Sequence, residues 1–269
     1  MIVKKRYAPI QLLGLEALIR RSSSVTDVMN TDLHKWQIGY RGECSIHYYL
    51  NQLDGFMILH DLRLPAEPSG FFQIDSLLLS KYGIIILEVK NFHGVIQFNE
   101  QSHQVLRILN DKEERIPNPL IQASRQQAQL DSFLIRNGLP SLPVSAYVVY
   151  SSPLTIFRTS HAKVIHAEAI PVQLESYKQK AKREYLTRTQ MEHISSLLMG
   201  ANKTFVPDLL KKYGLSSKNI QNGVHCTHCN KLTMIRPSRI RKWTCQNCYF
   251  SSQNAHIPTL QDYAVLFQA

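Results

Sequence analysis

The chain has 269 residues, of which 44% are apolar, so it is long and apolar enough to bury a sizeable core. This composition excludes an intrinsically disordered, collagen-like or coiled-coil protein. The formal net charge is +11, from 31 Lys and Arg against 20 Asp and Glu.

The positive charge is concentrated in the C-terminal part of the chain. Residues 176–250 contain 14 Lys or Arg and 3 Asp or Glu, whereas the remaining residues contain 17 of each kind. A basic segment of this kind favours a polyanionic partner, because phosphates release counterions when Lys and Arg replace them. Nucleic acid is the favoured partner, and an anionic membrane surface also fits the charge.

A membrane-spanning helix needs about 20 mostly apolar residues, and the sequence contains no such stretch. The basic start Lys4-Lys5-Arg6 leads to no small-residue cleavage site. We therefore expect a cytoplasmic protein that does not enter a membrane.

The first half of the chain alternates between helical and extended patterns. Apolar positions at helical spacing predict a helical lead-in over 10–21 and an amphipathic helix over 42–53, which Gly55 ends. Three strands are expected next, over 56–62, 71–80 and 84–90, and a tight turn joins the last two. Because both of these strands contain continuous apolar runs, we place them in the centre of the sheet.

The second half continues the alternation. The pattern predicts a helix over 121–137, a buried strand over 144–150, a short strand over 163–166 and a helix over 187–199. Helix, three strands, helix and strand in this order indicate an α/β fold, with a mixed β-sheet between helices.

Two carboxylates and a lysine lie on the central strands in the order Asp-x12-Glu-x-Lys: Asp75, Glu88 and Lys90. The tight turn makes the two strands antiparallel, so Asp75 can lie beside Glu88, and alternation puts Glu88 and Lys90 on one face. Converging carboxylates suit a hard divalent cation such as Mg²⁺, and Lys90 would orient a water or offset phosphoryl charge. The alternative is a solvated strand end with a minor ion pair.

Two helices carry further polar residues. Glu43 lies three residues before Ile46 and seven before Leu50, which points its carboxylate toward an apolar face. The second helix has a polar stripe that faces either a phosphate backbone or solvent, formed by Gln122, Arg125, Gln126 and Gln129.

These residues resemble the NERD (nuclease-related domain) family of the PD-(D/E)xK superfamily over roughly 39–150. The resemblance rests on five motifs: Gly42-Glu43 at a helix, Gln73-Ile74-Asp75, Gly83 through Glu88-Val89-Lys90-Asn91, Gly94, and Asn118-Pro119-Leu120-Ile121-Gln122.

The resemblance implies a restriction-endonuclease-like core, in which a mixed β-sheet is flanked by helices. It implies that Asp75 and Glu88 bind catalytic Mg²⁺ or Mn²⁺, that Lys90 is catalytic, and that Glu43 and Gln122 support the active site. Several branches of the superfamily keep the fold without activity, so the fold alone does not establish the chemistry.

Four of the five cysteines form two Cys-x2-Cys pairs, separated by 15 residues: Cys226, Cys229, Cys245 and Cys248. This spacing predicts a small zinc ribbon with a structural Zn²⁺, because four thiolates complete a tetrahedron and leave no place for a reacting water. Disulfide or redox chemistry is the alternative. We expect His225 and His228 to lie outside the metal site, and Cys44 to be a small buried side chain.

The segment between the two pairs has cations, one aromatic residue and no acidic residue. Cations for phosphates beside a ring that can stack on a base favour nucleic-acid binding, although the ring could instead pack over the metal site. The candidate contacts are Arg236, Arg239, Arg241, Lys242 and Trp243.

We expect five segments: a helical lead-in over 1–38, a nuclease-like domain over 39–175, a basic helical linker over 176–222, a zinc ribbon over 223–256 and a tail over 257–269. The leading hypothesis is a Mg²⁺-dependent nuclease that acts on DNA. The alternatives are a non-catalytic nucleic-acid-binding platform and a zinc-ribbon adaptor for protein partners. The sequence does not indicate an oligomeric state.

Overall fold

The computed structural model describes residues 1–99, 101–158 and 161–267. Two compact units make up the chain: unit 1 comprises Met1–Tyr7 and Gly39–Thr204, and unit 2 comprises Ala8–Ile38 and Phe205–Ala269. The five consecutive segments expected from the sequence divide the chain by composition and stay a prediction. The last two residues of the expected tail lie outside the described residues.

Unit 1 is built on a six-stranded mixed sheet in the order β1-β2-β3-β4-β8-β10. The central strands β2, β3 and β4 are antiparallel, whereas β4, β8 and β10 run parallel, as do β1 and β2. The strands are β1 (Ile2–Lys4), β2 (Met57–Pro65), β3 (Phe71–Ser80), β4 (Gly83–Lys90), β8 (Val144–Tyr150) and β10 (Val164–His166).

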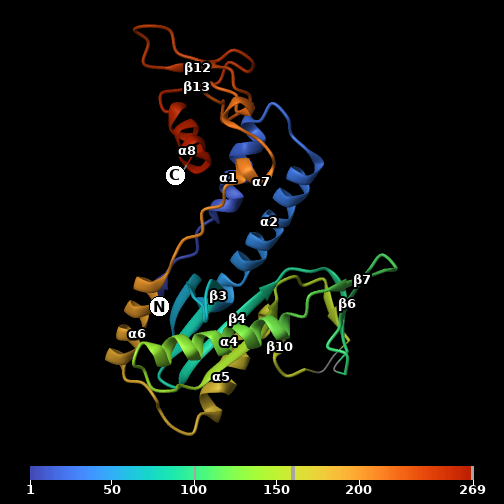
Figure 1. Ribbon diagram of the computed structural model, residues 1–269, viewed down its shortest axis with the longest axis vertical. Coiled ribbons are helices and arrows are strands. Elements are labelled where there is room, and N and C mark those ends of the chain that lie inside the picture. The colour runs from blue at the N-terminus through green and yellow to red at the C-terminus, as the bar shows by residue number, and fades with distance from the viewer. Residues whose placement is uncertain (100, 159–160, 268–269) are drawn as a thin grey trace. The chain divides into compact units, whose positions relative to one another are not determined.

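Helices cover both faces of this sheet, which confirms the predicted α/β fold with a mixed sheet between helices. On one face, α4 (Pro119–Arg136) and α6 (Arg188–Ala201) contribute Leu130, Leu134 and Leu198 to the core. On the other face, α3 (His47–Leu50) and α5 (Ile170–Lys180), which follows the 3-10 turn η1 (Ala167–Ala169), pack against the sheet. Figure 1 shows α4 running across the sheet. Residues 84–89 of β4 are all buried, as its apolar run predicts.

A second sheet, which the sequence analysis did not predict, follows β4 in the chain. It has the order β7-β6-β5-β9, with β5 (Gly94–Phe98), β6 (Val105–Leu109), β7 (Lys112–Ile116) and β9 (Thr155–Phe157). Asn110 and Asp111 join β6 to β7 with φ angles of 51° and 58°, and residues of this type at positive φ form tight hairpin turns.

The helix expected over 42–53 begins much earlier. The structure has α2 (Asp27–Ser45) followed by α3, and α2 contributes residues to both units. Gly42 is needed where α2 approaches the end of β4, because a Cβ at this position would lie 2.4 Å from the Asn91 Cβ atom.

Unit 2 combines helices with a small antiparallel sheet. Its helices are α1 (Ile10–Arg21), as predicted, α7 (Leu209–Lys212) and α8 (His256–Leu266), which occupies the expected tail; η2 (Ser217–Asn219) is a 3-10 turn. The sheet has the order β11-β12-β13, with β11 (Met234–Ile235), β12 (Trp243–Cys245) and β13 (Ser251–Ser252). Leu15, Leu18 and Met29 lie in its apolar core, and Arg21 and Asp262 form a buried ion pair.

Among the described helices, none combines the length and the hydropathy that a bilayer crossing requires.

Candidate functional site

The carboxylates predicted on the central strands lie side by side. The β3–β4 register pairs Ser76 with Leu87, so the adjacent position places Asp75 across from Glu88. Asp75 Oδ2 accepts a hydrogen bond of 2.8 Å from the Val89 backbone N–H. The Asp75 side chain therefore spans to the neighbouring strand and lies beside Glu88.

Lys90 connects this strand end to α4. Its Nζ lies 2.7 Å from Glu88 Oε1 and donates a hydrogen bond of 3.0 Å to Gln122 Oε1. Glu88 is 1% exposed, and its other oxygen accepts a 2.6 Å hydrogen bond from Gln126 Nε2. Asn118 positions this part of α4, because its side chain caps the helix by accepting from the Leu120 N–H.

A fully buried guanidinium, which the sequence analysis did not single out, holds the other residues of the site. Arg6 Nη1 donates to Glu43 and, at 2.6 Å, to Asp61 Oδ1. Arg6 Nη2 donates to the Asp75 backbone carbonyl at 2.7 Å and to Ser76 Oγ at 3.0 Å. Arg6 thus fixes both Glu43 and the backbone of Asp75.

Burial and mutual repulsion favour the neutral forms of two carboxyl groups. Burial raises the pKa of Glu43 to about 7, with Asp61 and Glu88 adding to the rise and Arg6 and Lys90 opposing it. Burial, followed by the charges of Glu88 and Glu43, raises the pKa of Asp75 well above its ordinary value. A cation at this place would stabilise the charged forms of both groups.

A second buried titratable group lies under the site. Burial, followed by the charge of Arg6, lowers the pKa of His60 to about 3, so its imidazole is neutral at pH 7. His60 Nδ1 lies 2.9 Å from Ser76 Oγ. Because His60 is uncharged, the positive charge of Arg6 is balanced by the carboxylates of Glu43 and Asp61.

Asp75 and Glu88 are the two carboxylates that could hold a Mg²⁺ ion. Among the described residues, Glu43, Asp75 and Glu88 do not form a group whose ligand oxygens all lie within 4.8 Å of one another. Mg²⁺ keeps several water ligands and needs only one or two protein carboxylates, so Asp75 and Glu88 suffice. Gln126 Oε1, which is buried and has no hydrogen-bond partner, is a further oxygen on the residue that contacts Glu88.

An open groove with a volume of about 740 Å³ runs beside this site. The polar stripe of α4 lines it with Gln122, Arg125, Gln126 and Gln129, together with Phe71 and Gln73 of β3. Gln122 and Arg125 are exposed, whereas Gln126 is 5% exposed and bonds Glu88. The exposed side chains of Gln122 and Arg125 therefore face the groove, whereas the buried Gln126 side chain belongs to the carboxylate site.

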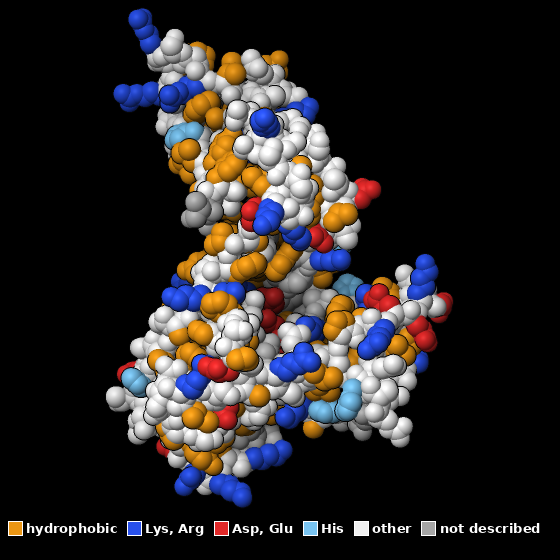
Figure 2. All heavy atoms as spheres, viewed as in Figure 1, with side chains coloured by type: hydrophobic (Ala, Val, Ile, Leu, Met, Phe, Trp, Pro, Cys, Tyr) orange, Lys and Arg blue, Asp and Glu red, His pale blue; other side chains and the backbone are white. Residues whose placement is uncertain are grey.

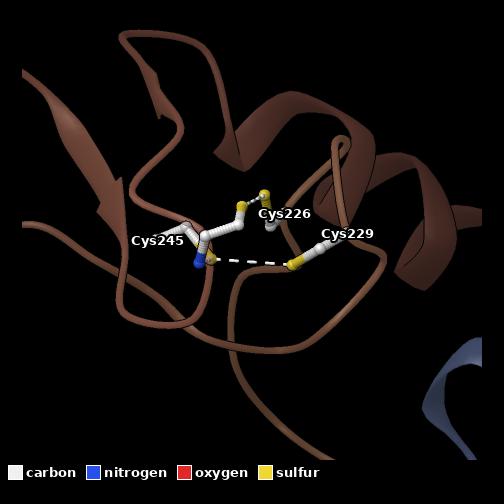
Figure 3. Close-up of side chains that lie close together, drawn as sticks. Cys226, Cys229 and Cys245 are labelled. Atoms are coloured by element: carbon white, nitrogen blue, oxygen red, sulfur yellow. Dashed lines mark hydrogen bonds between the residues drawn. The ribbon is translucent and has the colours of Figure 1, made fainter.

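The four cysteines of the two Cys-x2-Cys pairs meet in unit 2. Their sulfur atoms all lie within 4.8 Å of one another, and Cys226 Sγ is 3.6 Å from Cys248 Sγ. Cys229 Sγ is 3.7 Å from Cys245 Sγ, and Figure 3 labels these two residues and Cys226. A tetrahedron with metal–sulfur bonds of about 2.3 Å has sulfur–sulfur edges of about 3.8 Å. The cluster has the arrangement of a zinc ribbon and could bind a metal such as zinc.

The histidines beside the first pair have other partners. His225 Nδ1 lies 3.2 Å from Thr259 Oγ1, and the ring of His228 stacks on Phe250 with centroids 5.7 Å apart. Outside this unit, Cys44 is a half-buried free thiol on α2, and His93 is exposed with its backbone carbonyl bonded to Arg107.

The four cations predicted to contact nucleic acid lie on the loop between β11 and β12, and Trp243 is the first residue of β12. Arg236, Arg239, Arg241 and Lys242 are exposed, and Figure 2 shows Lys and Arg side chains projecting where Figure 1 places β12 and β13. Trp243 is half-buried and packs against the cysteine cluster, with Arg236 over its ring at 5.3 Å. The stacking role predicted for Trp243 stays a prediction.

Comparison with protein families finds a match for the central part of unit 1. Residues 38–151 match the NERD family, whose description is nuclease-related domain, and this range contains all five residues of the candidate active site. This stretch of the chain is similar to nuclease-related domains. The match extends from the second half of α2 to the end of β8, so it covers the strands and the helix that hold Lys90.

Two individual proteins are also similar to the chain. An uncharacterized protein of Bacillus anthracis is 24% identical over 181 residues, which cover 66% of this chain and 82% of that protein. The crystal structure of protein VC1899 from Vibrio cholerae is 11% identical with a TM-score of 0.25, and the alignment covers 74% of this chain and 59% of that one. A TM-score this low supports no conclusion about fold or function.

Proposed function

We propose that the protein is a nuclease that uses Mg²⁺ or Mn²⁺ to hydrolyse phosphodiester bonds of DNA, and that its ribbon assists nucleic-acid binding. The observation that carries this proposal is the contact of Lys90 Nζ with both Glu88 and Gln122 beside Asp75, within a nuclease-related domain. The groove along α4 offers a place for the substrate backbone next to these residues.

Each side chain of the site has a role that its position supports. A divalent cation held by Asp75 and Glu88 would supply charge stabilisation at the phosphoryl group and an acidified water. Lys90 orients the attacking water and offsets negative charge on the phosphoryl oxygens, because its ammonium is aimed into the site by two acceptors. Gln122 holds Lys90, and Glu43 adds a carboxylate that Arg6 positions.

The cysteine cluster has a structural role in this proposal. Four thiolates around Zn²⁺ leave no open position for a reacting water, and the basic loop between β11 and β12 contacts phosphates. Free thiols suit a reducing compartment, so we place the protein in the cytoplasm.

The proposal is tested by incubating the purified chain with circular and linear, single- and double-stranded DNA. Cleavage should require added Mg²⁺ or Mn²⁺ and should fall by roughly 100-fold or more in Glu88→Gln and Lys90→Ala. Mg²⁺ is omitted instead of chelated, because a chelator would also remove zinc. Glu192→Ala is the matched control, since this exposed residue on α6 only pairs with Arg188.

Two outcomes would contradict the nuclease proposal. One is cleavage that survives both substitutions. The other is DNA binding without cleavage under any metal condition, which would make the nuclease-like fold a binding platform.

A further inference from the structure

The two cysteine turns of unit 2 share a backbone feature but differ in the residue that carries it. The residue after the second cysteine of each pair has a positive φ: 56° at Asn230 and 59° at Tyr249. Asn adopts this left-handed conformation readily, whereas a bulky side chain does so at a cost in free energy. A glycine at position 249 would adopt the same left-handed conformation without this cost in free energy.

Packing within the chain does not explain the choice of Tyr249. The residue is 81% exposed, which is the largest exposed fraction among the large apolar and aromatic side chains of the described residues. Its ring has no aromatic or cation–π contact within the part of the chain that the structure describes. The chain therefore places an aromatic ring in solvent at a position where its backbone is strained.

The neighbours of Tyr249 point to a ligand with flat rings and negative charge. Phe250 is 37% exposed and stacks on His228 with an interplanar angle of 14°. Lys231 Nζ donates a 2.9 Å hydrogen bond to Asn247 Oδ1, which places an ammonium on the turn that carries Tyr249. Residues 223–256 contain five Lys or Arg and no Asp or Glu.

We propose that Tyr249 stacks on an unpaired base of single-stranded nucleic acid, with Lys231 contacting the adjacent phosphate. Bases in a duplex already stack on both faces, whereas an unpaired base offers a free face to an aromatic ring. Tyr249 is better placed for this contact than Trp243, which is half-buried and covered by Arg236. The inference rests on the proposed function only in taking nucleic acid as the partner.

Binding is measured by fluorescence anisotropy with the zinc-loaded full chain, a labelled oligothymidylate and a labelled duplex, with no Mg²⁺ added so that nothing is cut. Tyr249→Gly should weaken oligothymidylate binding by roughly 5- to 150-fold, the range for one stacked base, and should leave duplex binding unchanged. Tyr249→Phe should retain the affinity of the native chain. An oligouridylate arm shows whether the contact also accepts RNA.

Asn230→Gly is the matched control, because it makes the equivalent change at the other turn. Both Gly variants should keep the zinc content of the native chain, neither should lower its thermal midpoint, and Asn230→Gly should bind oligothymidylate normally. Unchanged affinity in Tyr249→Gly, or an equal loss in Asn230→Gly, would overturn the inference. A failed cleavage assay alone would not, because this measurement involves no catalysis.

Discussion

The buried side chain of Arg6 holds several residues of the candidate active site in place. One fully buried guanidinium contacts the carboxylates of Glu43 and Asp61 as well as the backbone carbonyl of Asp75. A buried cation is costly unless it is paired, because its charge is then uncompensated in a medium of low dielectric constant. The positions of Glu43 and Asp75 are therefore coupled through one buried side chain.

The raised pKa of Glu43 predicts a pH-dependent stability in the absence of Mg²⁺. Its pKa is about 7 in the folded chain against an ordinary value of 4.5, so the folded state binds more protons between these values. The free energy of unfolding should therefore lose the contribution of Glu43 as the pH rises from about 4.5 to 7. Denaturant unfolding at pH 5 and pH 7.5 measures this loss.

Glu43→Gln separates this contribution from those of other groups. The variant does not titrate, so its free energy of unfolding relative to the native chain should rise between pH 5 and pH 7.5. A constant difference between the two proteins across this range would contradict the predicted pKa effect.

The sequence pointed to those candidate residues that lie within a short, recognisable stretch of the chain. The Asp-x12-Glu-x-Lys spacing across a tight turn is enough to pair Asp75 with Glu88, and the β3–β4 register agrees. Arg6 gives no such signal, because its partners lie 37 to 70 residues away. Gln126 could have been singled out, since it lies one helical turn after Gln122 on the polar stripe.

Helix α2 brings Glu43 to the site through a close approach to the sheet. Gly42 has no room for a methyl group, because a Cβ would lie 2.4 Å from the Asn91 Cβ and 2.8 Å from the Ser151 Oγ. Gly39, one turn earlier in the same helix, would place a Cβ in open space. Substitution of these two glycines by alanine should therefore change the free energy of unfolding in opposite directions.

Alanine substitutions should separate the two positions. Gly39→Ala should raise the free energy of unfolding by about 0.5–1 kcal/mol, because alanine favours the helix. Gly42→Ala should lower it by about 1–3 kcal/mol through overpacking, and should also reduce cleavage by displacing Glu43. Guanidinium unfolding of both variants measures these changes; equal effects at the two positions would refute the close approach.

At the scale of elements, the sequence predicted the layers of unit 1 but not its second sheet. The central strands were identifiable because their apolar runs are long, as in residues 84–87. Strand β9 has three residues and pairs with β5 across more than 50 residues, so no local pattern marks it. Asn110-Asp111 between two short strands was a readable hairpin signal. The helix α2 was missed over 27–41, where the apolar residues are interspersed with polar and charged ones.

At the scale of the whole molecule, removal of zinc should affect the two units differently. The buried residues around the cysteine cluster are few, so we expect metal binding to supply most of the local folding energy in the ribbon. Cys226→Ser should abolish zinc binding and amide protection over 223–256, while the amides of β3 and β4 stay protected. Metal analysis and hydrogen exchange measure both effects.

Cys44→Ser is the control for this experiment, because Cys44 lies outside the cluster and should not alter zinc content. Loss of protection in β3 and β4 after zinc removal would show that the units fold as one.

The basic loop should dominate the salt dependence of DNA binding. Replacing Arg239, Arg241 and Lys242 with alanine should reduce the slope of log affinity against log salt by about 2–3, if each contacts one phosphate. Lys112→Ala with Arg115→Ala removes two exposed cations of β7 and should leave the slope unchanged. An unchanged slope in the triple variant would assign phosphate binding to another surface.

Each unit is built from two separate stretches of the chain, so unit 1 cannot be expressed alone by a single C-terminal truncation. A chain truncated after Thr204 keeps residues 8–38 but loses the segments that bury Leu15, Leu18 and Met29. Such a fragment would carry an uncovered apolar helix and would be prone to aggregation, whatever the fate of its catalytic residues. Inactivity or insolubility of that truncation would therefore say nothing about whether the ribbon takes part in cleavage.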